Sequence, residues 1–128
     1  MLVDSTIYID LLRRGEDILY VLKPSLLSGQ LFVCGVIRME VLRGIRSRGM
    51  RDELSDFFDL MTEVPTDTRI WREATNLAWT LDRRRVVLPL TDLVIASCAL
   101  AVRTAVVTTD PHFWRIPGLK VKKSFVSR

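Results

Sequence analysis

The sequence predicts an α/β fold built around a parallel β-sheet. Short apolar runs rich in β-branched residues alternate with longer segments of helical periodicity, an order typical of parallel strands joined by right-handed crossovers. The chain has 128 residues, 48% of them hydrophobic, with 6 Gly and 5 Pro. A chain of this size and composition can bury one core without long linkers, so we expect a single domain spanning residues 1–128.

The N-terminal segment is expected to form one strand and two helices. The apolar run Leu2–Asp4 predicts the strand. Ser5 and Thr6 can cap the helix that follows at Ile7–Arg14. A second helix is expected at Asp17–Leu27, after a glycine that ends the first one.

The middle of the chain is expected to form a buried strand and two further helices. The run Leu31–Cys34 is continuously apolar, which is typical of a strand covered on both faces. Helices are expected at Val36–Ser47 and Arg51–Met61, with Gly49 as the break between them. Val64-Pro65 predicts a short extended piece, because the residue before a proline is pushed toward β geometry.

The C-terminal half is expected to contain two helices followed by two strands. A long amphipathic helix is predicted at Asp67–Arg84. Its apolar face carries Trp71, Ala74, Leu77, Ala78 and Leu81. Thr91 can cap the next helix, Asp92–Arg103, which is apolar on nearly all sides and should therefore be central. Strands are expected at Ala105–Thr109 and Leu119–Lys122.

Four carboxylates interrupt or end apolar runs, where a core would exclude them. They are Asp4, Glu40, Asp92 and Asp110. In open parallel sheets, ligands bind outside the carboxyl ends of the strands. Asp4 and Asp110 follow predicted strands, Asp92 opens a helix, and Glu40 lies one turn inside a helix that follows a strand. All four acids can therefore face one crevice.

Three of the acids also have a structural interpretation that needs no ligand, whereas the one for Glu40 is weaker. Asp4 could act as a helix N-cap, although Ser5 and Thr6 could do so equally well. Asp92 could favour the positive end of its helix dipole, and Asp110 could cap a turn through Pro111. Taken together, the four are harder to explain, because two carboxylates about 4 Å apart repel by about 4 kcal/mol at an effective dielectric of 20. An oxygen-only set suits Mg²⁺ or Mn²⁺ better than zinc.

Charge and cysteine content bear on partners and compartment. The net charge of +4 and the clustered arginines favour a polyanionic partner such as nucleic acid, although solvated helix faces would give the same composition. Cys34 and Cys98 match no metal or redox spacing and are expected to be reduced core residues. Because Asp4 interrupts the first apolar run, no signal peptide is expected there, and no apolar stretch approaches the roughly 20 residues of a membrane span. We therefore expect a cytoplasmic protein that does not enter a membrane.

Four segments, in this order, resemble one known family along almost the whole chain, from Leu2 to about Val121. They are VDSTIYIDLL, RMEVLRG, LTDLVIASCALA and VVTTDPHF. The set resembles the PIN-domain ribonucleases, and most closely the VapC-type toxins of toxin–antitoxin modules. The resemblance implies a three-layer α/β/α sandwich with a central parallel sheet. It also implies Mg²⁺-dependent endonucleolytic cleavage of structured RNA such as tRNA or rRNA, with Mn²⁺ able to substitute.

The resemblance also assigns residues and partners. The acidic quartet of the family maps onto Asp4, Glu40, Asp92 and Asp110, all as catalytic and metal-binding residues. Its supporting polar positions fall on Thr6 and Thr108. Three of the acids, Asp4, Asp92 and Asp110, are expected to hold one or two metal ions, while Glu40 completes the shell or orients the attacking water. A homodimer is implied, as is a VapB-type antitoxin whose tail occupies the acidic groove.

Other positions have simpler interpretations. Many family members carry a further acid where this chain has His112, its only histidine. His112 could touch RNA or transfer protons, but a solvent-facing position beside the proline is expected. Asp10 is expected to pair with Arg13 or Arg14. The aromatic residues Trp71, Trp79 and Phe113 are expected in the core or in dimer contacts rather than in base stacking.

Three rival functions fit the sequence less well. A response-regulator receiver needs an acidic pair near the first strand and a lysine near the fifth, but Ser5 follows Asp4 and no lysine lies between Lys23 and Lys120. A haloacid-type phosphatase needs Asp-x-Asp, where this chain has Asp4-Ser5-Thr6. The non-enzymatic alternative is a catalytically inactive PIN domain that binds RNA or a protein, and retention of all four acids argues against it.

Overall fold

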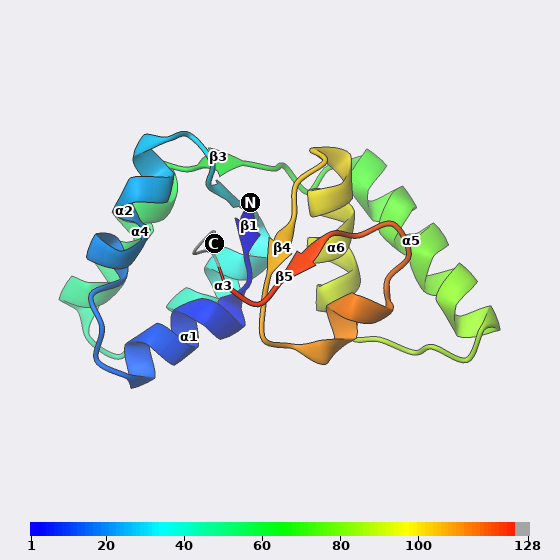
Figure 1. The fold of residues 1–128 in the computed structure, drawn as a ribbon, viewed down its shortest axis with the longest axis horizontal. Coiled ribbons are helices and arrows are strands. Elements are labelled where there is room, and N and C mark those ends of the chain that lie inside the picture. The colour runs from blue at the N-terminus through cyan, green and yellow to red at the C-terminus, as the bar shows by residue number, and fades with distance from the viewer. Residues whose placement is uncertain (125–128) are drawn as a thin grey trace.

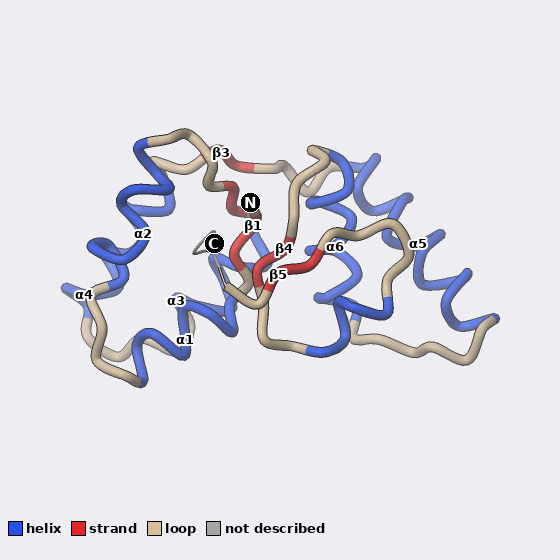
Figure 2. The backbone as a smooth tube through the Cα atoms, in the orientation of Figure 1, coloured by secondary structure: helices blue, strands red, loops and turns tan. Residues whose placement is uncertain are grey.

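The structure, a computed structural model, describes residues 1–124; the last four residues of the predicted domain lie outside the described part. It contains a five-stranded sheet in the order β3-β2-β1-β4-β5, in which every neighbouring pair is parallel (Figure 1). The strands are β1 (Leu2–Val3), β2 (Phe32–Val33), β3 (Thr62–Glu63), β4 (Val106–Val107) and β5 (Val121–Lys122). The predicted parallel sheet is confirmed, although four of the strands are shorter than expected (Figure 2). The extended piece predicted at Val64-Pro65 lies two residues earlier, at β3.

Helices cover the sheet on both sides. They are α1 (Ser5–Arg13), α2 (Ile18–Leu27), α3 (Gly35–Leu42), α4 (Arg48–Asp59), α5 (Thr68–Arg83), α6 (Leu90–Ala101) and the short 3₁₀ helix η1 (Pro111–Arg115). In Figure 1, α1, α2 and α4 lie to one side of the strands, and α5 and α6 lie to the other. Helix α3 contacts both α1 and α6. The predicted three-layer α/β/α sandwich is confirmed.

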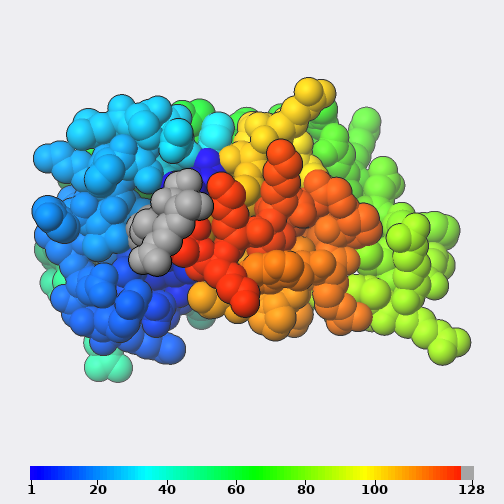
Figure 3. Space-filling model, viewed as in Figure 1, coloured from blue at the N-terminus to red at the C-terminus, as the bar shows by residue number. Residues whose placement is uncertain are grey.

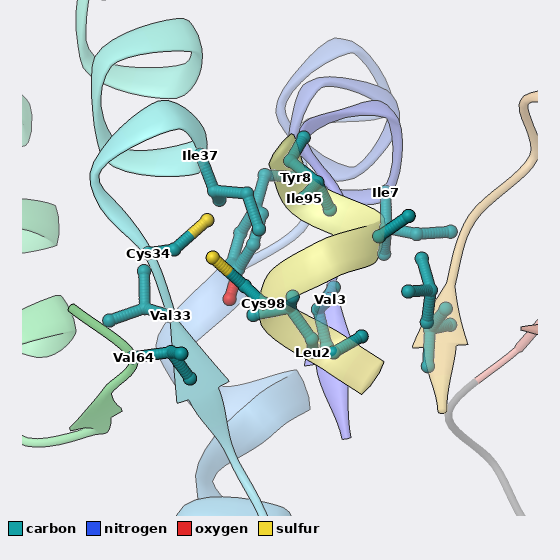
Figure 4. Packing of buried hydrophobic residues seen from close by; sticks show 14 of the residues in the cluster. Leu2, Val3, Ile7, Tyr8, Val33, Cys34, Ile37, Val64, Ile95 and Cys98 are labelled. Carbon is teal, nitrogen blue, oxygen red and sulfur yellow. The ribbon is translucent and has the colours of Figure 1, made fainter. Parts of the chain in front are cut away.

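The core is centred on β1 and α6 (Figure 4). Every residue from position 92 to 99 of α6 is buried, so the prediction of a central helix is confirmed. In the same core, the buried rings of Tyr8 and Phe58 meet edge to face, with their centroids 5.2 Å apart. Burial also raises the pKa of the Tyr8 phenol well above its usual range.

The two cysteines belong to this core. Cys34, directly after β2, and Cys98, on α6, are both buried and reduced, as the sequence predicted. Figure 4 shows their sulfur atoms turned toward each other. A hydrogen bond with Cys98, followed by burial, raises the pKa of the Cys34 thiol, so it remains protonated at neutral pH.

Two helix boundaries in the middle of the chain were wrongly predicted. The helix expected to reach Ser47 ends at Leu42, and Ser47 instead caps α4 by accepting a hydrogen bond from the backbone N–H of Met50 at 3.3 Å. Gly49, the expected break, lies inside α4. A side-chain cap stabilises a helix start by about 1 kcal/mol, which offsets the similar cost of one glycine inside the helix.

The expected caps of α1 and α6 also differ. Asp4 occupies the N-cap position of α1, so Ser5 and Thr6 lie inside its first turn. Helix α6 begins at Leu90 with Pro89 at its N-cap position, so Thr91 does not cap it. Both helices begin earlier in the sequence than predicted. In α1 this leaves the Thr6 hydroxyl free of a capping role, so it can make other contacts.

The apolar face of α5 is rotated from the prediction. Ile70, Ala74 and Leu81 are buried, with Leu77 and Ala78 partly so, whereas Trp71 is 54% exposed. Ile70 heads the stripe because it stands four and seven residues before Ala74 and Leu77. Trp71 and Trp79 are both exposed, so neither lies in the core, and the alternative of dimer contacts stays a prediction. Phe113 is buried, as expected.

Segments from the two ends of the chain meet in the middle of the molecule. β1 pairs with β4, and β4 with β5, so the last segment, red in Figure 3, lies across the centre between the N-terminal part and the C-terminal helices. Within residues 1–124, the helices are all too short or too polar to cross a membrane.

The central position of α6 leads to a stability prediction. Ile95 is fully buried, so Ile95→Ala should lower the free energy of unfolding by about 2–5 kcal/mol in urea titrations. Leu90→Ala is the matched control, because Leu90 belongs to the same helix but is 75% exposed; it should change stability by less than about 0.5 kcal/mol. Equal effects of the two substitutions would contradict the central placement of α6.

Candidate functional site

The register of the two central strands brings Asp4 beside Thr108. Val3 is aligned with Val107, so the residues that follow them lie side by side at the carboxyl edge of the sheet. The Thr108 hydroxyl donates to Asp4 Oδ2 at 2.9 Å, and both residues are buried. This hydrogen bond joins positions 104 residues apart. It fixes the orientation of a carboxylate that is almost out of contact with solvent.

Thr6 supports the same carboxylate from the first turn of α1. Its hydroxyl donates to Asp4 Oδ2 at 2.9 Å and lies 3.2 Å from the Thr108 hydroxyl oxygen. The backbone N–H of Thr109 donates to Thr6 Oγ1 at 3.3 Å. Both threonines suggested by the sequence therefore contact Asp4 directly.

Asp110 is tied to this pair through Thr108. The backbone N–H of Asp110 donates to Thr108 Oγ1 at 2.9 Å. The Asp110 carboxylate accepts from the backbone N–H of His112 at 3.0 Å and so caps η1, a structural role foreseen for an Asp-Pro pair. This turn leaves the acid half-buried and directs it toward the same edge of the sheet.

Asp92 joins the cluster through the imidazole of His112. Asp92 lies in the first turn of α6 and is buried. The Nδ1 atom of His112 is 2.9 Å from Asp92 Oδ2 and 3.1 Å from Asp110 Oδ1. The expected solvent-facing position of His112 is only partly right, because the side chain is 41% exposed while its Nδ1 edge faces two carboxylates. The turn capped by Asp110 folds the ring back between two carboxylates.

Glu40 completes the group from α3. Its carboxylate accepts a hydrogen bond from the Ser5 hydroxyl at 3.3 Å, and it is half-buried. Ser5 directly follows Asp4, so this contact brings α3 to the start of α1. The structure thus brings together all four acids and both threonines predicted from the sequence.

The electrostatics of the cluster oppose full ionisation. Burial, then the neighbouring Asp4 carboxylate, raises the pKa of Glu40. Burial raises the pKa of Asp92 as well; the hydrogen bond with His112 works against that rise, and the nearby acids add to it. Within residues 1–124, no lysine or arginine forms an ion pair with any of the four acids. The four carboxylates therefore lack a lysine or arginine partner that would compensate their negative charge.

The donor set fits a divalent cation. One atom each from Asp92, Asp110 and His112 lies within 4.8 Å of the other two, close enough to share an ion. Asp4 has its carboxylate already oriented by two hydroxyls, as ligating carboxylates commonly are. Carboxylate oxygens suit Mg²⁺ and Mn²⁺.

The arginines suggested by the sequence divide into two groups. Arg14 pairs with Asp10 at 3.1 Å, as predicted for Asp10, and Arg51 contacts Asp52 at 3.3 Å. These exposed pairs contribute little to stability. By contrast, Arg43 at the end of α3 is exposed and close enough to Glu40 for its charge to work against the rise in the pKa of that carboxylate. The guanidinium group of Arg43 therefore gives this side of the acidic cluster a positive charge that an anion could approach.

Sequence reasoning missed two members of the site, His112 in its actual position and Ser5 as a partner of Glu40. An Asp-Pro pair followed by a histidine carried a usable signal for the first. When an Asp caps such a turn, the residue two positions on is pulled toward its carboxylate. The Ser5 contact joins residues 35 positions apart and had no local signal.

Comparison with known proteins gives one family and one fold. The PIN domain profile matches residues 1–119. A search of curated proteins found no significant match to the sequence. Among solved structures, the chain is similar to one from DNA-bound VapBC of Salmonella typhimurium, with 18% identity, a TM-score of 0.78, and coverage of 94% of this chain and 95% of that chain.

Two further structures give the same picture. VapBC2 from Rickettsia felis, bound to a promoter DNA fragment, contains a chain with 19% identity and a TM-score of 0.75, covering 94% of this chain and 96% of that one. VapBC-5 from Mycobacterium tuberculosis gives 17% identity, a TM-score of 0.64, and coverage of 96% and 97%. At these identities the likeness concerns the fold.

The raised pKa of Asp92 predicts a stability effect in metal-free protein. Because the folded state binds this proton more tightly than the unfolded chain, the ionised group is destabilising above its folded pKa, and the cost disappears as the pH falls. In EDTA at pH 7.5, Asp92→Asn should therefore melt at a higher temperature than the parent, and the difference should shrink toward pH 4. The exposed Asp56→Asn on α4 serves as control and should show no such pattern. A lower melting temperature for Asp92→Asn at pH 7.5 would contradict this electrostatic description.

Proposed function

This chain belongs to the PIN domain family, and we propose that it is a metal-dependent endoribonuclease, the toxin of a VapBC-type toxin–antitoxin pair. Its substrate is structured RNA such as tRNA or rRNA, in which it hydrolyses phosphodiester bonds. The observation that carries the proposal is the acidic cluster at the carboxyl edge of the sheet. It gathers four carboxylates from α3, from α6 and from the segments that follow β1 and β4, without a lysine or arginine ion pair in the described part of the chain.

The residues of the cluster suit distinct tasks. Asp4, Asp92 and Asp110 would hold Mg²⁺, with Mn²⁺ able to substitute, and Thr6 and Thr108 orient the first of these carboxylates. When bound, such a cation activates water and offsets the charge that develops on a phosphoryl group. Glu40 can complete the ligand shell. It can also orient the attacking water and accept its proton, a role favoured by its raised pKa.

The basic surroundings support a polyanionic substrate. The chain carries a net charge of +4 despite 15 acids. Arg43 lies near Glu40, and Arg46 and Arg48 are exposed on the segment that follows. Phosphates flanking the cleaved bond would be held by such residues, because phosphate contacts supply most sequence-independent affinity for nucleic acid.

Two kinds of protein partner belong to the proposal. The structural relatives are VapBC complexes, which supports a VapB-type antitoxin as the inhibitor of this chain. A basic side chain of that antitoxin could neutralise the acidic cluster in place of a metal ion. A homodimer and a cytoplasmic location complete the proposal.

Cleavage of total cellular RNA by purified, antitoxin-free protein tests the activity. With Mg²⁺ or Mn²⁺ we expect discrete cuts that EDTA abolishes. Asp4→Asn and Asp92→Asn should each lower the rate by more than the about 10–100-fold that loss of an outer-shell contact costs. The exposed Asp56→Asn serves as a matched control and should cut normally.

The same protein preparations separate an enzyme from an inactive scaffold. A metal bound only by the folded state raises the melting temperature. Metal-dependent stabilisation without cuts would indicate a narrow target or retained inhibitor, whereas neither cuts nor stabilisation at millimolar metal would favour an inactive RNA- or protein-binding module. Full cleavage by Asp92→Asn would disprove the proposed site.

The hydroxyl of Thr108 gives a second prediction at this site. Thr108→Val keeps the shape of a buried side chain but removes the donor to Asp4 and the acceptor of the Asp110 N–H. We expect Mn²⁺ affinity, measured by calorimetry, to fall about 10–100-fold. Thr104→Val makes the same chemical change before the other end of β4 and should leave the affinity unchanged. Unaltered affinity in Thr108→Val would remove Thr108 from the supporting shell.

A further inference from the structure

His112 places a nitrogen atom inside a site whose other candidate ligands are all oxygens. Its Nδ1 atom lies 2.9 Å from Asp92 Oδ2 and 3.1 Å from Asp110 Oδ1. A neutral imidazole carries at most one hydrogen on this nitrogen and can direct it fully at only one acceptor. The hydrogen bond to one carboxylate therefore does not explain the close approach to both.

The position of the ring is fixed on both sides. Asp110 caps η1 and accepts the backbone N–H of His112, which holds the residue next to that carboxylate. The next residue, Phe113, is fully buried and anchors the turn in the core. The second carboxylate, Asp92, is buried in the first turn of α6, against which η1 packs. The position of the imidazole is thus set by the contacts of η1 with the rest of the fold.

The separations match those between neighbouring ligands of one cation. Six-coordinate Mg²⁺ has bonds of about 2.0–2.1 Å, so ligand atoms at right angles stand about 2.9–3.0 Å apart. Both distances from Nδ1 are close to this edge, and the three ligand atoms lie within 4.8 Å of one another. A metal between them would need small side-chain adjustments and no change in the fold.

We propose that His112 is a direct ligand, through Nδ1, of a metal ion shared with Asp92 and Asp110, and that it shifts the selectivity of this site from Mg²⁺ toward Mn²⁺ and Co²⁺. The inference rests on the proposed function only in requiring that a divalent metal binds here. Oxygen ligands suit Mg²⁺, whereas imidazole suits transition metals, whose affinity for a given site rises from Mn²⁺ to Co²⁺. The single nitrogen makes this site unlike an all-carboxylate one.

Binding measurements on untagged protein test the selectivity without RNA. The dissociation constants for Mg²⁺, Mn²⁺ and Co²⁺ would be measured by calorimetry for the parent, His112→Asp and His112→Asn. In His112→Asp the preference for Co²⁺ over Mg²⁺ should fall about tenfold or more, because an oxygen replaces the nitrogen while the ligand count is kept. Arg115→Ala is the control in the same turn and should retain the parental preference.

A spectroscopic readout on the unaltered chain identifies the nitrogen atom. His112 is the only histidine, so its imidazole ¹⁵N signals in labelled protein need no assignment by mutation. On adding diamagnetic Zn²⁺, the Nδ1 signal should move to the position of a coordinated nitrogen, while Nε2 keeps its proton. This measurement stands even if a variant fails to fold in EDTA.

The outcomes separate this inference from the proposed function. An unchanged metal preference in His112→Asp, together with an Nδ1 signal that does not respond to metal, overturns the role of His112 and leaves a ribonuclease with oxygen ligands alone. A folded parent that binds none of the metals overturns both proposals. Histidine-dependent metal binding supports the ligand whether or not cellular RNA is cut, because the binding measurements contain no RNA.

Discussion

The hydrogen bond from Thr108 to Asp4 is the contact on which the arrangement of the site depends. It forms because β1 and β4 are parallel neighbours with Val3 opposite Val107, so that the next residue of each strand reaches the same edge. The Thr108 hydroxyl also accepts the N–H of Asp110. One side chain therefore sets the orientation of the first acid and the start of the turn that carries the last. Cleavage chemistry at this edge would draw on residues from both ends of the chain.

The acidic cluster lowers the stability of the metal-free fold. Asp4 and Asp92 are buried, and burial raises the pKa of both Asp92 and Glu40. In metal-free protein the ionised forms of Asp92 and Glu40 oppose folding at neutral pH, since water no longer solvates these two carboxylates fully. The surrounding core, above all α6, must offset that cost. A bound cation, or a basic group of an inhibitor, reverses the sign of the contribution by supplying the missing positive charge.

The sequence was sufficient for the sheet and for the acids because both follow local rules. Apolar runs identified the strands, and acids after strands pointed to the carboxyl edge, where Asp4 and Asp110 lie. Helix boundaries and the buried face of a helix were harder to predict, because several local preferences compete there. The cap at Ser47 prevailed over Gly49. On α5, which packs against α6, Ile70 rather than Trp71 faces the core.

The contacts of His112 could not be predicted from the sequence. A lone histidine beside a proline is most simply a surface residue, and only the closure of the turn by Asp110 brings its ring to Asp92, 20 positions away. Nδ1 of His112 carries at most one hydrogen, so it cannot donate a full hydrogen bond to both nearby carboxylates. They form a favourable arrangement around a cation that accepts all three as ligands. Under the proposed ligation, the nitrogen of His112 rather than the family resemblance would determine which metal this chain prefers.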